Sequence, residues 1–141
     1  MHAAQPHKSP VCFLFDNGSL RPTSTLSLRA TARQLAVELG IEVRAVSLLH
    51  SSAVNPVEVG GKPAQLLEPA LEAFLEENPT ADVVALPLFF GPSAALTDYV
   101  PGRLAMLSGK FPQARLRLAR WLVDPIETDD RIGRHRPLRF L

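Results

Sequence analysis

The stretch LFDNGSLRP, from Leu14 to Pro22, marks the point where a first strand gives way to a first helix. It follows a short apolar run, Val11 to Phe15, and it precedes apolar residues at helical spacing over 24–39, which Gly40 is placed to end. In α/β proteins such strand-to-helix turns are where ligands usually bind. This turn is therefore the first candidate for a functional site.

The same alternation of patterns continues along the chain. Further strands are expected over 41–49, 82–90 and 114–121, and further helices over 63–77 and 97–108. The run DVVALPLFF, 82–90, lacks polar alternation, which is typical of a central parallel strand covered on both faces. This βαβαβαβ order, with right-handed crossovers, predicts an α/β three-layer sandwich around a four-stranded parallel sheet.

The second helix raises two expectations about its prolines. Pro63 suits a first helical turn, so the helix is expected to begin there. Pro69 would then lie inside the helix, where proline removes a backbone hydrogen bond and kinks or breaks the chain. The pattern therefore predicts a kinked helix or two shorter pieces.

Length and composition indicate one domain with its own core. The chain has 141 residues, of which 46% are hydrophobic, and a formal net charge of +1, too small to suggest nucleic acid as the main partner. The single cysteine, Cys12, allows no disulfide within the chain and favours a reducing, cytoplasmic location. No apolar run approaches the ~20 residues of a spanning helix, so no membrane association is expected. We expect a flexible leader over 1–10, a domain over 11–132 and a basic tail over 133–141.

Three loops should meet at the carboxyl ends of the strands. They cover 16–22, 50–62 and 91–97, and all three are rich in serine, glycine, asparagine and proline. In open parallel sheets the ligand site lies at this edge, where the strand order reverses. The loops therefore predict a site for a small polar or anionic ligand.

Several motifs in these loops resemble the small sirohydrochlorin chelatases of the CbiX/SirB type. The family carries a strand followed by His-Gly-Ser-x-x-Pro, where this chain reads NGSLRP over 17–22. The family's Pro-Leu-Phe-Leu strand end corresponds to PLFF over 87–90, and its Asp-Ile-Pro helix start to DYVP over 98–101. The resemblance extends over about 11–125. It implies a chelatase-like fold, a homodimer, no organic cofactor, and insertion of Co²⁺ or Fe²⁺ into a tetrapyrrole of the cobalamin or sirohaem pathway.

The chain departs from the family at both metal-binding histidines. Asn17 stands at the first and Ala94 at the second, and neither side chain replaces imidazole as a ligand for cobalt or iron. If the chain is a chelatase, its ligands are rearranged, with His50 as metal ligand and catalytic base and Asp16 assisting. Two alternatives stay open: a non-catalytic relative that binds a tetrapyrrole or a metal, and an unrelated small-anion site on the same scaffold.

The candidate substrate-binding residues are those that could hold carboxylates. Gly18 allows a tight turn and close backbone approach, and Arg21 can grip a carboxylate with two hydrogen bonds. The remaining candidates offer amide, hydroxyl or backbone donors: Asn17, Ser19, Ser51, Gly91 and Ser93. Each has a structural alternative, because Asx and Ser residues also form turns and helix caps, and His50 could be an ordinary hydrogen-bonded loop histidine.

Overall fold

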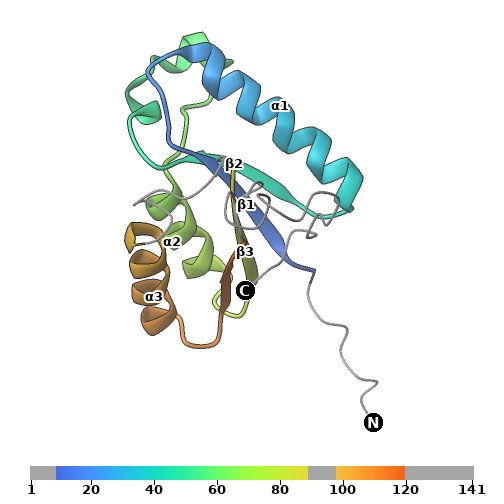
Figure 1. The fold of residues 1–141 in the computed structure, drawn as a ribbon, viewed down its shortest axis with the longest axis vertical. Coiled ribbons are helices and arrows are strands. Elements are labelled where there is room, and N and C mark those ends of the chain that lie inside the picture. The colour runs from blue at the N-terminus through green and yellow to red at the C-terminus, as the bar shows by residue number, and fades with distance from the viewer. Residues whose placement is uncertain (1–8, 89–97, 120–141) are drawn as a thin grey trace, which may run out of the picture.

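The chain builds an α/β sandwich around a four-stranded parallel sheet, as the sequence predicts (Figure 1). The computed structural model describes residues 9–88 and 98–119. The sheet has the order β2-β1-β3-β4, and all its neighbours pair in parallel. The strands are β1 (Val11–Asp16), β2 (Val43–Ser47), β3 (Asp82–Pro87) and β4 (Arg115–Leu118). The helices are α1 (Pro22–Leu39), α2 (Leu67–Glu77) and α3 (Val100–Lys110), with short 3₁₀ turns at Ser51–Ala53 and Pro56–Val59.

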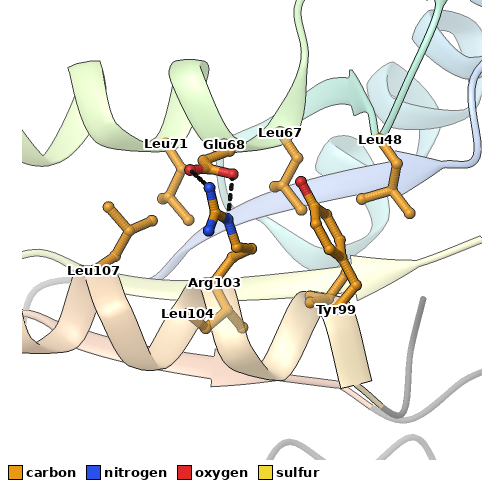
Figure 2. A pocket seen from close by; sticks show the side chains of 9 residues that line it. Leu48, Leu67, Glu68, Leu71, Tyr99, Arg103, Leu104 and Leu107 are labelled. Atoms are coloured by element: carbon orange, nitrogen blue, oxygen red, sulfur yellow. Dashed lines mark hydrogen bonds and ion pairs between the residues drawn. The ribbon is translucent and has the colours of Figure 1, made fainter. Parts of the chain in front are cut away.

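The helices are distributed unequally between the two faces of the sheet. Helix α1 lies on one face, and α2 and α3 lie side by side on the other (Figure 1). A bidentate ion pair joins α3 to α2: the Arg103 guanidinium donates to the two carboxylate oxygens of Glu68 at 2.7 and 2.8 Å (Figure 2). The two helices therefore form one layer.

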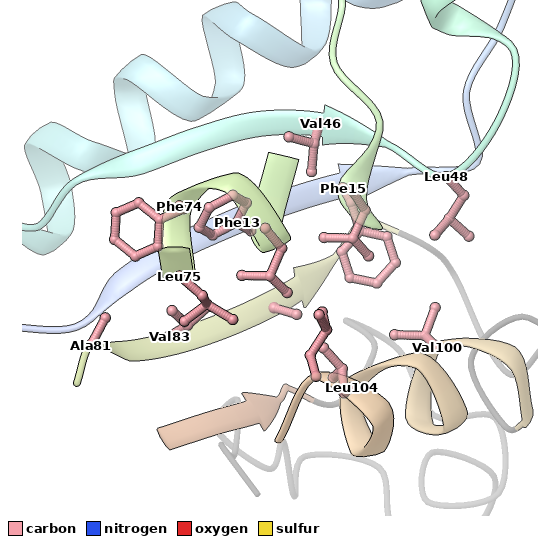
Figure 3. Packing of buried hydrophobic residues seen from close by; sticks show 14 residues of the cluster. Phe13, Phe15, Val46, Leu48, Phe74, Leu75, Ala81, Val83, Val100 and Leu104 are labelled. Atoms are coloured by element: carbon pink, nitrogen blue, oxygen red, sulfur yellow. The ribbon is translucent and has the colours of Figure 1, made fainter. Parts of the chain in front are cut away.

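Alternate residues of β1 supply both halves of the core. Phe13 and Phe15 pack toward α2 and α3, where the Phe13 ring meets Phe74 edge-on with centroids 5.5 Å apart (Figure 3). Cys12 and Leu14 point the opposite way, toward α1. Because every side chain from 12 to 15 is at most 2% exposed, β1 is buried on both faces, as a central parallel strand must be.

Helix α1 begins and ends at the residues that its sequence favours. Pro22 is the first helical residue, two positions before the expected start, because the fixed φ of proline suits the first turn. Gly40 ends the helix in the left-handed conformation, with φ 67°, and its N–H donates to the carbonyl of Ala36 at 2.9 Å. The sequence-based end of this helix is confirmed.

Helix α2 differs from the prediction at its start. It begins at Leu67, not at Pro63, because the preceding residues run beside β2: the Ser47 N–H donates to the carbonyl of Gln65 at 3.0 Å, and Ser47 and Leu66 form a parallel bridge. Pro69 therefore falls in the first turn, where a backbone N–H has no helical partner to lose. The predicted kink was wrong for this reason, and the helix runs unbroken to Glu77.

The other boundaries are shorter than or shifted from the sequence patterns. The strands expected over 41–49 and 114–121 occupy 43–47 and 115–118, and α3 covers 100–110 in place of 97–108. Strand β3 ends at Pro87, before the aromatic pair at 89–90, which lies outside the described residues. None of the helices in the described ranges is long and apolar enough to cross a bilayer.

The connections place a switch point between β1 and β3. After β1 the chain passes to α1 on one face, whereas after β3 it proceeds to α3 on the other. Neighbouring strands whose connections leave toward opposite faces leave a crevice at their carboxyl ends. The turn after β1 lies at that position.

Candidate functional site

The site begins where β1 and β2 end side by side. Asp16 and Ser47 are register partners at the carboxyl ends of the two strands. The Ser47 hydroxyl, which is buried, donates to Asp16 Oδ1 at 2.5 Å. One oxygen of the Asp16 carboxylate is thus held by the scaffold. That contact orients the second oxygen, Oδ2, which has no hydrogen bond of its own among the described residues.

Beyond the strands, the two chains stay hydrogen-bonded through a tight turn. The Leu48 N–H donates to the Asp16 carbonyl at 2.9 Å, and the Leu49 N–H donates to the Asn17 carbonyl at 3.0 Å. Gly18 follows at φ 97°, and a Cβ added there would lie 1.6 Å from the carbonyl oxygen of Leu49. Both the dihedral and the close approach require glycine, as the sequence predicts for this position.

Two serines lock the turn onto the following loop. The buried Ser51 hydroxyl accepts the N–H of Ser19 at 3.0 Å, and the Ser19 hydroxyl accepts the N–H of Arg21 at 3.0 Å, immediately before α1. Ser51 is 1% exposed, so its hydroxyl does not face solvent and contacts the turn from the protein interior. The structure therefore assigns both predicted ligand-binding serines a positioning contact within the protein.

His50 has an unusual backbone conformation. Its φ is 69° and its ψ −37°, the one positive φ on a non-glycine residue in the described chain. The Leu49 carbonyl accepts the N–H of Ser51 at 2.8 Å, which closes a three-residue turn around His50. Turns of this type with positive φ are rare and strained, and glycine would adopt this one at lower cost. The imidazole itself is exposed.

The structure brings most of the predicted site residues to one edge of the sheet. The turns that hold Asn17 to Ser19 and His50 to Ser51 are directly hydrogen-bonded to each other. Asn17, Arg21 and His50 have exposed side chains there, so these three can meet a ligand. Gly91 and Ser93, predicted for the third loop, lie outside the described residues.

Metal binding at this edge depends on few donors. His50 and Asp16 supply imidazole and carboxylate, donor types that suit cobalt or iron. Among residues 9–88 and 98–119, no three His, Cys, Asp or Glu side chains come together as a ligand group. A metal held here would complete its coordination with water, with a substrate or with groups beyond those ranges.

A small apolar cavity lies on the α2–α3 face, close to where both helices begin (Figure 2). Leu48, Leu67 and Tyr99 line one end of it, and the Glu68–Arg103 ion pair crosses it. Its volume of about 20 Å³ has room for roughly one water molecule. The Arg103 guanidinium is already engaged, because its hydrogen bonds to Glu68 raise its pKa. A cavity of this size does not accommodate a macrocycle.

Cys12 is excluded as a nucleophile. It is 2% exposed in the layer between the sheet and α1, and burial raises the pKa of its thiol to about 11. A thiol with so high a pKa stays protonated near neutrality and packs as a small apolar group.

Two residues that hold the site together have no signal in the sequence. Ser47 reaches Asp16 only because of the strand register, and the Leu49 carbonyl limits the space at Gly18. Both depend on how β2 pairs with β1, which composition and periodicity do not specify. A lone Ser at a strand end and an exposed Leu look ordinary in the sequence.

Comparison with known proteins adds nothing to the functional assignment, which therefore rests on the residues described above. No protein-family model matches the chain, and no curated protein is significantly similar to it.

Proposed function

We propose that this protein is a chelatase-like protein that binds a sirohydrochlorin-type tetrapyrrole at the carboxyl edge of its sheet and inserts Co²⁺ or Fe²⁺ there. The observation that carries the proposal is the strained, exposed His50 beside the rigid Gly18 turn. Backbone strain at an exposed residue, whose side chain takes no part in the packing of the core, is typical of functional sites. The substrate class rests on the resemblance of the loops at 17–22, 87–90 and 98–101 to the small sirohydrochlorin chelatases.

Each exposed residue has a role in this proposal. His50 ligates the incoming metal ion through its exposed imidazole, a ligand type that suits cobalt and iron. Insertion releases two pyrrole protons; Asp16 Oδ2 accepts one, and the other passes to solvent. Arg21 pairs with a peripheral carboxylate of the ring, and Asn17 with the Gly18 turn offers neutral donors. A second copy of the chain encloses the other face of the ring, as the resemblance implies.

A second candidate is binding without insertion. It is favoured by the hydrogen bond from Ser47 to Asp16, which already occupies one carboxylate oxygen and so leaves Asp16 less free to take up pyrrole protons. In this version the protein holds a tetrapyrrole, or delivers it to another enzyme of the pathway, without metallating it.

The test is a visible-absorbance titration of the purified protein with sirohydrochlorin, with and without Co²⁺. Insertion predicts a metallation rate above the uncatalysed rate, and His50→Ala lowers that rate by about a hundredfold, because it removes the proposed metal ligand. His135→Ala is the matched control, since it removes another histidine of the same chain.

The outcomes separate the two candidates. A rate enhancement that depends on His50 and not on His135 supports insertion. Saturable spectral change without rate enhancement excludes insertion and supports binding alone. If sirohydrochlorin produces no saturable change, both candidates are wrong.

A further inference from the structure

A broad trough lies away from the candidate site, between α1, the outer edge of β2 and the loop over 59–65. Its volume is about 650 Å³, within the range of functional binding clefts. Apolar side chains form part of its lining, among them Leu26, Val43 and Val59. The trough is therefore large and mixed in character, unlike the small cavity between α2 and α3.

The lining of the trough is strongly cationic. Arg29, Arg33, Arg44 and Lys62 all line it, and no aspartate or glutamate does so among the described residues. Two of the four are already engaged: Arg29 donates to the carbonyls of Val59 and Lys62, and Arg44 pairs with Glu42.

The side chains of Arg33 and Lys62 are the available charges. Both are exposed, and neither has a hydrogen-bond or ion-pair partner within 9–88 and 98–119. Arg33 stands on α1 and Lys62 on the facing loop, so two unpaired cations flank the trough from opposite walls. This arrangement is complementary to a ligand that carries several carboxylates.

The floor of the trough includes an open strand edge. The Cys12 N–H donates to the Glu42 carbonyl and the Leu48 N–H to the Asp16 carbonyl, so the even-numbered residues of β2 face β1. The backbone groups of the odd-numbered residues then face outward. At Ser47 that outward N–H donates to the carbonyl of Gln65, but at Val43 and Ala45 the outward groups have no partner among the described residues.

We infer that the trough binds an extended acidic peptide of a partner protein, added as a short strand to the outer edge of β2. The backbone of the peptide pairs with Val43 and Ala45, in line with the contact that Gln65 makes at Ser47. Its carboxylates meet Arg33 and Lys62. An edge strand with open backbone groups recruits strands readily, and the two cations select acidic ones.

Fluorescence anisotropy tests this with a labelled octapeptide that alternates glutamate and valine. Arg33→Glu and Lys62→Glu should each weaken binding about five- to tenfold, because each replaces an attraction by a repulsion. Arg115→Glu is the matched control: it makes the same change of charge at an exposed position on β4, at the opposite edge of the sheet. It should leave the affinity unchanged. Circular dichroism verifies that each variant is folded.

Two further probes separate strand addition from simple charge attraction. The same octapeptide methylated on every backbone nitrogen keeps its side-chain charges but has no N–H on either edge to donate to β2, so it should bind at least tenfold more weakly. The octapeptide that alternates lysine and valine should not bind.

Several results would overturn the inference. These are no measurable binding, an equal loss in Arg115→Glu, an equal affinity of the methylated peptide, or tighter binding of a short single-stranded oligothymidylate. The inference is independent of the proposed function. Arg33→Glu and Lys62→Glu should leave the spectral change and metallation rate with sirohydrochlorin unchanged, and His50→Ala should leave the affinity for the peptide unchanged.

Discussion

Two neighbouring turns at the carboxyl edge of the sheet both hold a residue at positive φ, but only one of them holds glycine. At Gly18 the fold leaves no choice, because the Leu49 carbonyl lies where a Cβ would be. At His50 glycine would suit the backbone better, and the chain has a histidine. The first residue is explained by space. Space does not explain the second, and backbone strain at an exposed side chain is typical of functional sites.

The largest expected effect comes from the turn that is limited by space. Gly18→Ala introduces both an unfavourable φ and a contact with a backbone carbonyl that cannot rotate away. We expect a loss of about 3–5 kcal/mol in the free energy of unfolding, measured by urea denaturation. Gly60→Ala is the control, since Gly60 has φ 77° but nothing within 4 Å of an added Cβ. If both variants lose the same amount, the close approach to Leu49 is unimportant.

A smaller loss is expected at the hydrogen bond that connects the two turns. Ser51→Ala leaves the partly buried Ser19 N–H without its acceptor, which should cost about 1–3 kcal/mol of unfolding free energy. Ser52→Ala, at the exposed neighbouring position, should change stability by no more than about 0.5 kcal/mol. Equal stabilities of the two variants would show that Ser51 does not support the turn.

The smallest effect has the opposite sign. His50→Gly relieves the strained backbone but adds unfolded-chain entropy, so we expect a net gain of about 0.5–1 kcal/mol in unfolding free energy. His50→Ala keeps the strain and should stay close to the parent. Both variants should lose the metallation activity described above. A stabilised His50→Gly that still metallates sirohydrochlorin would show that the imidazole is not needed.

The sequence predicted the architecture because the architecture depends on local patterns. The apolar run at 11–15, the helical spacing over 24–39 and Gly40 each act over a few residues, and together they specify an alternating α/β chain. Prediction failed at the start of α2, where Pro63 favoured a helix locally. There the residues before Leu67 pair with the edge of β2, a contact between segments far apart in the sequence that local patterns do not report.

The candidate site was predictable in position but not in detail. The convergence of the turns at 16–19 and 49–51 follows from the parallel topology. The role of each residue within it does not: the sequence offers Ser51 as a ligand-binding residue, whereas its hydroxyl supports the Ser19 backbone. Nothing in the sequence marks Ser47, which holds Asp16. Which serine faces inward depends on strand register and on the direction of each turn, neither of which a single sequence encodes visibly.

The two hydrogen bonds from Arg29 to the loop over 59–62 have a consequence for how this protein can evolve. Its guanidinium binds the carbonyl oxygens of Val59 and Lys62, and every amino acid provides such a carbonyl. Substitutions of the exposed side chains of the loop therefore leave these two hydrogen bonds and the position of the loop in place. One arginine on α1 preserves the shape of the trough, while mutations at Lys62 and its exposed neighbours are free to change which partners it selects.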